Sequence, residues 1–139
     1  YYLVEEKALF TGDVVLGGST TVIPPDDGDL ADYMASLRRL QQLDVARIYP
    51  AHGPVIEDAP AKLREYVEHR LERERQILAA LAGDRATIPE IVAHVYVGVS
   101  PALHGAAAMS VQSHLRALEK QGRVKERVVS GEPSRWALA

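Results

Sequence analysis

The sequence predicts a mixed α/β chain in two modules, and three observations support this prediction. Apolar runs of strand length alternate with an amphipathic helical pattern in the first part of the chain, which favours a layered architecture of sheet and helix. A long helical pattern ends at Gly83, and further helical patterns are followed by a strand, a turn and a second strand. With 139 residues, 47% of them hydrophobic, the chain can bury one core, or part of a core plus a small satellite domain.

Composition excludes several kinds of site and of protein. The chain has no cysteine, which excludes disulfides and thiolate ligands and leaves His, Asp and Glu to hold a metal. No apolar run reaches the ~20 residues of a membrane span and no segment resembles a signal peptide, so we expect a cytoplasmic protein with no membrane partner. The net charge of -3 is uneven: residues 1–83 have nine Lys and Arg against fourteen Asp and Glu, and residues 84–139 have seven against five. This asymmetry indicates two modules with different partners.

The first module begins with two strand patterns. Residues 1–4 are apolar, residues 5–7 predict a charged tight turn, and the segment "ALFTGD" predicts a second strand that Gly12 ends. Asp13 therefore stands at the end of a core strand. Because a desolvated carboxylate needs a partner, Asp13 is solvated, hydrogen-bonded within its own turn, or a metal ligand.

A helix and a third strand follow a turn-rich loop. Asp29 is expected to cap the helix "LADYMASLRRLQQL", whose apolar residues recur at three- and four-residue spacing. The segment "VARIYPAHGPVI" predicts a strand that ends at Tyr49 and a loop, stiffened by Pro and Gly, that contains His52. Rigid elements hold ligands better than mobile ones, so His52 is a second candidate for chemistry. A loop histidine bonded only to backbone groups is the alternative.

A long helix is expected to link the two modules. The segment "PAKLREYVEHRLERERQILAALAG" follows Asp58 and stops at Gly83, and at more than twenty residues it would be about 30 Å long. Its charged residues, Arg70 among them, are expected to form a solvated surface with i,i+4 pairs. His69 lies off the apolar stripe; it is a candidate for substrate binding, and a solvated or half-buried structural role is the alternative that its position favours.

The sequence pattern of the second module predicts three helices followed by two strands. Thr87 and Glu90 fit a capping box at the start of "IPEIVAHVYVG". A short second helix is expected from Pro101, and Ser110 is expected to cap the third helix, "VQSHLRALEKQG". The segment "RVKERVVSGEPSRWALA" then predicts a hairpin with Trp136 as its core anchor. This order of elements is that of a winged helix.

The end of the chain is basic. Residues 109–139 have six Lys and Arg against three Asp and Glu, which favours phosphate contacts through counterion release. The third helix is expected to turn polar residues outward, Ser113 among them, and a winged helix that packs only against protein is the alternative. The candidates for nucleic-acid binding are Arg116, Lys120, Arg123 and Lys125.

Three of these segments together resemble a known family. "LFTGD", followed about forty residues later by "IYPAHGP" and then by "YVEHRLERERQIL", resembles the C-terminal half of the metallo-β-lactamase-fold hydrolases. The nearest likeness is to the β-lactamase-like protein 2 group of zinc-dependent single-strand endoribonucleases, which are related to glyoxalase II. The resemblance implies the C-terminal half of an αββα sandwich with its linking helix over residues 1–83, and a winged-helix-like domain over residues 84–139. It also implies two zinc ions, with Asp13 bridging them and His52 completing the second site.

The sequence departs from this family at one important motif. The family's His-x-His-x-Asp-His motif and a further lone histidine are absent, since the five histidines stand at positions 52, 69, 94, 104 and 114. We therefore expect a fragment without the N-terminal half of the fold, with zinc absent or weakly bound and no hydrolase activity of its own. Residues 1–10 should then be covered by that N-terminal half or by a second copy of the chain, as a homodimer.

The resemblance implies that the parent protein is a hydrolase. Two zinc ions about 3.5 to 4 Å apart would activate water at neutral pH, and the expected reaction is cleavage of phosphodiester bonds in single-stranded RNA, with the winged helix helping to hold the RNA. A thioester hydrolase of the glyoxalase II type is the rival enzyme. A non-enzymatic winged-helix module that binds nucleic acid or protein is the rival from another class.

Overall fold

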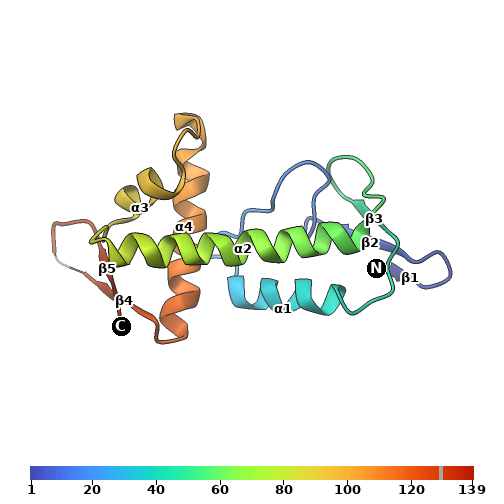
Figure 1. Ribbon diagram of the computed structural model, residues 1–139, viewed down its shortest axis with the longest axis horizontal. Helices are drawn as coiled ribbons and strands as arrows, with labels where there is room; N and C mark the ends of the chain where they lie inside the picture. The colour runs from blue at the N-terminus through green and yellow to red at the C-terminus, as the bar shows by residue number, and fades with distance from the viewer. Residues whose placement is uncertain (129) are drawn as a thin grey trace. The chain divides into compact units, whose positions relative to one another are not determined.

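The first part of the chain contains a three-stranded sheet (Figure 1). The computed structural model describes residues 1–128 and 130–139. The strands are β1 (Tyr2–Leu3), β2 (Ala8–Gly12) and β3 (Arg47–Pro50). The central strand β2 pairs antiparallel with β1 and parallel with β3. A parallel pair needs a crossover connection, and the helix between β2 and β3 supplies it, so the predicted alternation of strand and helix is confirmed.

Contacts divide the chain into two compact units. The first is Tyr1–Thr21 with Ala31–Arg70, and the second is Val22–Leu30 with Leu71–Ala139. A unit defined by its contacts need not be a domain that folds alone. The predicted domain limits, 1–83 and 84–139, therefore stay a prediction.

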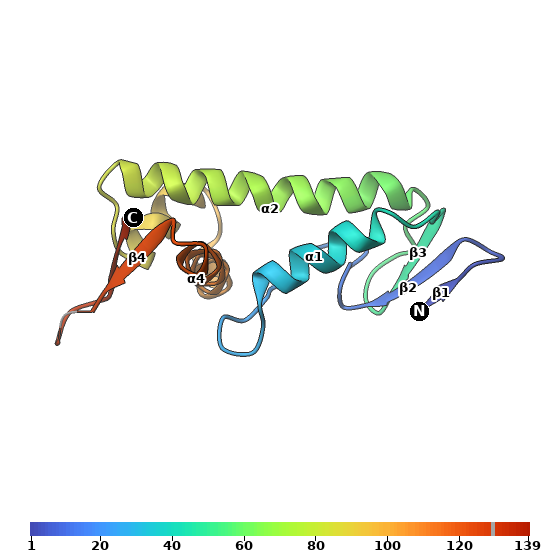
Figure 2. The same cartoon turned by 90° about the horizontal axis from the view of Figure 1, so that it is seen from below.

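Two helices complete the first unit. They are α1 (Leu30–Leu40) and the first part of α2 (Ala59–Ala82), which run side by side in both views (Figures 1 and 2). The core between helices and sheet consists of Leu9, Leu37, Ile48, Leu63 and Tyr66, none more than 3% exposed. Although α2 is 24 residues long, no helix in the described part of the chain is apolar enough to cross a membrane.

The ends of α2 follow the predicted signals. The Asp58 carboxylate accepts a hydrogen bond of 2.9 Å from the N–H of Ala61, as an N-cap does. At the other end the N–H of Gly83 bonds the carbonyls of Ala79 and Ala80, and Asp84 has a left-handed φ of 62°. The predicted stop at Gly83 is confirmed.

The second unit has a separate core. Its elements are the end of α2, α3 (Ile88–Val95), the short 3-10 turn η1 (Pro101–Leu103), α4 (His104–Lys120), β4 (Val124–Arg127) and β5 (Arg135–Leu138). Ile77 of α2, Ile91 of α3 and Leu115 of α4 are fully buried in this core, and Trp136 of β5 is 2% exposed among them. The roles of Trp136 as core anchor and of Thr87 with Glu90 as a capping box are confirmed. Residue 129, which lies in the predicted hairpin, is outside the described residues.

The predicted boundary between the second and third helices of this unit is wrong. Ser110 caps no helix, because α4 runs unbroken through it from His104. Alanine is the strongest helix former, and the run Ala106-Ala107-Ala108 extends the helix N-terminally past the serine. Within the described residues, only two α-helices therefore follow Gly83, and the third helix of the core is the end of α2.

The N-terminal residues leave aromatic surface exposed. Tyr1 is 82% and Phe10 45% exposed, and the Phe10 ring stacks on Tyr49 with centroids 5.2 Å apart. What covers this surface, whether an N-terminal half of the fold or a second copy of the chain, stays a prediction.

Candidate metal site at the edge of the sheet

Asp13 stands directly after β2 because the strand ends in a left-handed glycine. Gly12 has a φ of 56°, a conformation that side chains with a Cβ rarely adopt, and the pairing with β3 shifts register between Phe10 and Gly12. The chain turns away from the sheet at this point. The Asp13 carboxylate is thereby left at the edge of the sheet with 68% of its side chain exposed.

His52 reaches the same edge from the neighbouring strand. β3 runs parallel to β2, so the carboxyl ends of both strands meet there, and the N–H of Ala51 bonds the carbonyl of Gly12 at 3.0 Å. The result is a distance of 3.5 Å between His52 Nε2 and Asp13 Oδ1. The structure thus brings together two residues that are 39 positions apart in the sequence.

Two glycines allow the loop that contains His52 to lie against the loop after Asp13. The N–H of Gly17 donates a 3.0 Å hydrogen bond to the carbonyl of His52. A Cβ placed on Gly17 would lie 2.2 Å from the carbonyl oxygen of Pro54. Gly53 has a φ of 90°, so the approach requires glycine on both sides.

Polar side chains from the helices hold the loop that follows Asp13. The hydroxyl of Tyr66 on α2 donates to the carbonyl of Ser19 at 2.5 Å and accepts from the N–H of Leu16 at 2.9 Å. The hydroxyl of Tyr33 on α1 donates to the carbonyl of Val14 at 2.7 Å. These bonds satisfy backbone groups of a segment that has no regular secondary structure.

A second pair of contacts extends this support to Asp13 itself. Thr21 Oγ1 donates to the carbonyl of Asp13 at 2.6 Å, and Arg70 donates to the carbonyl of Thr21. Arg70 is only 6% exposed, so the expectation that it lies on the solvated surface of the helix is wrong. Its buried guanidinium lies 5.4 Å from the centre of the Tyr33 ring.

Tyr33, Tyr66 and Arg70 support the site and were not identified as supports from the sequence. Burial raises the pKa of Tyr33, and the nearby positive charge of Arg70 opposes that shift. In the sequence, Tyr33 is only one of the apolar residues that recur at three- and four-residue spacing in its helix. The only sequence signal for this supporting role is that each side chain has a polar end. When buried, the hydroxyl of Tyr and the guanidinium of Arg need hydrogen-bond partners.

The donor atoms at this edge fit part of a zinc site. Carboxylate oxygen and imidazole nitrogen are both zinc ligands, and Asp13 and His52 present one of each to solvent within 3.5 Å. Residues 1–128 and 130–139 contain no group of three or more His, Asp or Glu residues that could hold a metal. This chain therefore presents two donors, whereas a catalytic zinc commonly has three from protein.

His69 lies on the exposed surface of α2. It is next in sequence to Arg70, whose side chain turns into the core of the first unit. Exposure allows a contact with substrate, and the assignment of His69 to substrate binding stays a prediction.

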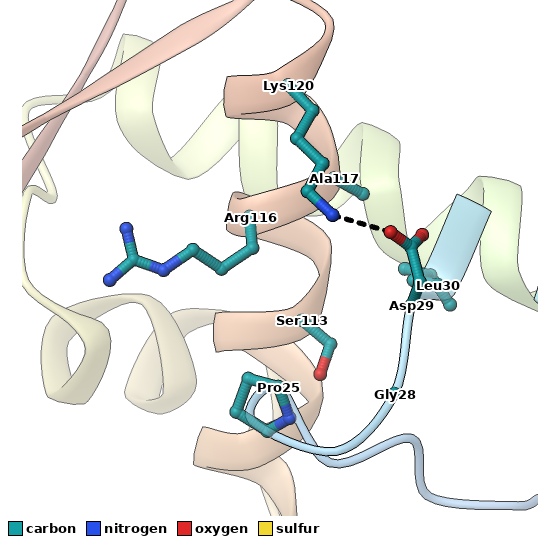
Figure 3. A pocket seen from close by; sticks show the side chains of 8 residues that line it. All are labelled: Pro25, Gly28, Asp29, Leu30, Ser113, Arg116, Ala117 and Lys120. Carbon is teal, nitrogen blue, oxygen red and sulfur yellow. Dashed lines mark hydrogen bonds and ion pairs between the residues drawn. The ribbon is translucent and has the colours of Figure 1, made fainter. Parts of the chain in front are cut away.

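The predicted nucleic-acid-binding residues belong to the second unit, and three of the four are in ion pairs there. Arg116 binds Glu126 at 2.6 Å, Lys120 binds Asp29 at 2.5 Å (Figure 3), and Arg123 binds Glu74 at 2.5 Å. Lys125 is exposed on β4. Whether any of these side chains contacts nucleic acid stays a prediction.

Ser113 differs from its prediction. It was expected to face outward from the third helix, but it is 5% exposed and its Oγ donates to the carbonyl of Ile23 at 2.5 Å. The segment that contains Pro25, Gly28 and Asp29 lies along this side of α4 (Figure 3). The helix pattern alone could not show that this segment returns to cover α4.

Comparison with known proteins identifies both parts of the chain. Residues 1–52 match the metallo-beta-lactamase superfamily, and residues 87–136 match the beta-lactamase associated winged helix domain. A beta-lactamase-like protein 2 homolog of Caenorhabditis elegans is 42% identical over 89% of this chain and 41% of its own length. The lactamase-like protein adaB of Aspergillus niger is 40% identical over 98% of this chain and 46% of its own length.

Solved structures give the same result. A metallo-beta-lactamase family protein from Thermus thermophilus has a TM-score of 0.79 and 26% identity, over 99% of this chain and 44% of that protein. A beta-lactamase domain protein from Burkholderia ambifaria shares the fold with a TM-score of 0.85. The chain spans less than half the length of these relatives and structures. With a superfamily match over its first strands and a winged helix match over its second core, the chain belongs to the metallo-beta-lactamase superfamily.

Proposed function

We propose that this chain supplies two zinc ligands, Asp13 and His52, to a hydrolase that cleaves phosphodiester bonds of single-stranded RNA. The observation that supports the metal role is the 3.5 Å separation of Asp13 Oδ1 and His52 Nε2 at the carboxyl edge of the parallel strands. The RNA substrate is proposed from the resemblance to the β-lactamase-like protein 2 group. A cytoplasmic location likewise stays a proposal.

Each ligand has a distinct task at this edge. The Asp13 carboxylate would hold zinc through its oxygens, and its negative charge would offset the repulsion between two cations. His52 offers an imidazole nitrogen, and the Gly17 N–H on its backbone carbonyl fixes the loop from which it reaches. Zinc, when bound, supplies Lewis acidity that polarises the ester and makes water a nucleophile at neutral pH.

The remaining donors are proposed to come from outside these 139 residues. Two ligands are fewer than a catalytic zinc commonly takes, and the relatives are more than twice as long as the matched segment. The proposal therefore concerns the longer protein, in which an N-terminal half of the fold completes the site. These 139 residues alone are expected to have no hydrolase activity.

The test uses the longer protein that contains this chain. Asp13→Ala and His52→Ala should each lower both the zinc content, measured by elemental mass spectrometry, and the turnover of a labelled single-stranded RNA. Asp27→Ala, which removes an exposed carboxylate from a loop of the second unit, is the matched control and should change neither. Full zinc content and full activity in Asp13→Ala would refute the metal assignment.

The substrate class needs a parallel assay. The same preparations should be tested on an acyl-glutathione thioester, because the rival enzyme cleaves that bond. Hydrolysis of the thioester alone, sensitive to Asp13→Ala, would retain the metal site and overturn the RNA assignment. Binding of RNA without hydrolysis of either substrate would favour the non-enzymatic module.

A further inference from the structure

The β4–β5 hairpin places three cations on one face. Antiparallel register sets Arg127 opposite Arg135 and Lys125 opposite Ala137, and directly opposed residues of a sheet share a face. Residues two apart in a strand also share a face, so Lys125 joins the two arginines. All three side chains are exposed, whereas Trp136 on the other face is buried.

This arrangement is unfavourable unless an anion is nearby. Directly opposed side chains have Cβ atoms about 4.5–5.5 Å apart, and like charges at that distance destabilise a strand pair. Within the described residues, none of Lys125, Arg127 and Arg135 has a carboxylate within ion-pair distance. Among residues 1–128 and 130–139, no direct contact with a carboxylate compensates the three positive charges of this short hairpin.

The nearest carboxylates are already engaged. Glu126 points to the opposite face and binds Arg116 at 2.6 Å. The carboxylate of Glu90 accepts hydrogen bonds from the N–H groups of Thr87 and Ala86. These bonds are the main reason why the pKa of Glu90 is low, and the charge of Arg135 adds only a small effect.

The neighbouring helix α4 offers a poorer site for an anion. Its cations Arg116 and Lys120 are ion-paired, and Ser113 is bonded to Ile23. The pocket between α4 and residues 25–30 holds about 130 Å³ (Figure 3), below the roughly 300 Å³ of the smaller ligand sites. A polymer would have to break these contacts to reach the helix.

We propose that the outer face of the β4–β5 hairpin, formed by Lys125, Arg127 and Arg135, binds the phosphodiester backbone of single-stranded RNA. Guanidinium groups bind phosphate through two parallel hydrogen bonds, so the opposed arginines can converge on one phosphate. Lys125 is two residues from Arg127, about 7 Å along the strand, and can reach the next phosphate. The choice of RNA rests on the proposed function.

Recognition by this face should not depend on base sequence. Sequence-tolerant binding of single strands combines charge with aromatic platforms for the bases, but Trp136, the only aromatic residue after Tyr96, is 2% exposed in the core. The hairpin therefore binds the charged phosphates of the RNA and not its bases. Uridine and adenosine oligomers of equal length should have equal affinity.

The test measures binding of labelled single-stranded RNA to the full 139-residue chain by fluorescence anisotropy at two salt concentrations. The variant Lys125→Gln with Arg127→Gln and Arg135→Gln should bind at least about tenfold more weakly at low salt. Single-strand contacts each contribute about 0.7 to the slope of log affinity against log salt, so three contribute about 2. Between 50 and 200 mM salt, the unmodified chain should therefore lose about twentyfold more affinity than the variant.

A matched triple variant controls for net charge. Arg38→Gln with Arg64→Gln and Arg75→Gln removes three exposed cations, none of them a candidate for nucleic-acid binding, and should keep the affinity within about threefold and most of the salt slope. Circular dichroism must show that both triple variants are folded. Equal losses in both, or no loss in the hairpin variant, would overturn the proposal.

Two further measurements fix the ligand and separate this proposal from the enzymatic one. Binding to anionic phospholipid vesicles without binding to RNA would contradict it. RNA binding that is lost in the hairpin variant, together with a longer protein that cleaves no RNA, would retain the hairpin site and refute only the proposed hydrolysis.

Discussion

At Gly17 the chain has no room for a side chain. Substitution by alanine, which adds one methyl group, therefore tests whether the close contact at Gly17 positions the loop that contains His52. Its Cβ would lie 2.2 Å from the Pro54 carbonyl oxygen, whereas a Cβ on the adjacent Gly18 would meet nothing within 4 Å. Gly17→Ala should lower the free energy of unfolding by about 1–3 kcal/mol through overpacking. Gly18→Ala should change it by less than about 0.5 kcal/mol, as measured by urea denaturation.

The two glycine variants should also differ in the longer protein. Displacement of Pro54 moves the loop that contains His52, so Gly17→Ala should lower zinc content, and Gly18→Ala should not. Equal stability and equal zinc content in the two variants would show that the contact between these loops does not position the histidine.

The two predicted ligands could be identified from the sequence, whereas the residues that hold their loop in place could not. Asp13 and His52 could be identified because each follows a strand pattern and sits beside Gly or Pro, which are local signals. Tyr66 bonds a loop 47 to 50 residues away, and Arg70 bonds Thr21, 49 residues away. No local pattern encodes such pairs, since they exist only after the sheet and both helices have packed.

Among the elements, α3 has the clearest pH dependence. The pKa of Glu90 is lowered below its ordinary 4.5, first by hydrogen bonds from Thr87, so the folded state favours the carboxylate. A depressed folded pKa stabilises the protein above the unfolded pKa, and this stabilisation is lost as the pH falls through the folded value. Glu90→Gln should therefore lower the urea midpoint near neutral pH and have little effect in acid, below both pKa values.

Two companion variants separate the carboxylate from the rest of the cap. Thr87→Ala removes the other half of the capping box and should cost about 1 kcal/mol, including in acid, where the Glu90 effect is gone. Glu132→Gln, at an exposed position near the tip of the hairpin, controls for the loss of one negative charge. An effect of Glu90→Gln that is the same at every pH would contradict this account.

Helix ends could be predicted where residues next to the end form capping hydrogen bonds. They could not be predicted where the only signal was a change in the spacing of apolar residues. The capping box of α3 and the stop at Gly83 are confirmed because both depend on hydrogen bonds within a few residues. Ser110 was misread because serine also lies inside helices, and the preceding alanines favour continuation. Trp136 was predictable from its size and chemistry alone.

For the whole molecule, the candidate site and the candidate RNA surface lie in different units. Asp13 and His52 belong to the first, and the cationic face of the hairpin belongs to the second. Binding and chemistry can therefore be tested by separate variants. Two separate family matches are also found: residues 1–52 match the metallo-beta-lactamase superfamily, and residues 87–136 match the beta-lactamase associated winged helix domain.

The last prediction concerns zinc and this chain alone. Only Asp13 and His52 come together at the sheet edge, and no third donor joins them in the described residues, so zinc should keep most of its water. We expect calorimetric titration to give a Kd weaker than about 1 μM, which corresponds to less than about 8.2 kcal/mol of binding free energy. The double variant Asp13→Ala with His52→Ala should give nearly the same weak heats from scattered surface carboxylates.

Because a ligand that binds only the folded state stabilises it in proportion to the logarithm of its concentration over Kd, zinc near 1 μM should hardly raise the melting temperature. Sub-micromolar binding that disappears in the double variant would mean that these two residues suffice for a zinc site, and that the donors proposed from outside this chain are not needed to hold the metal.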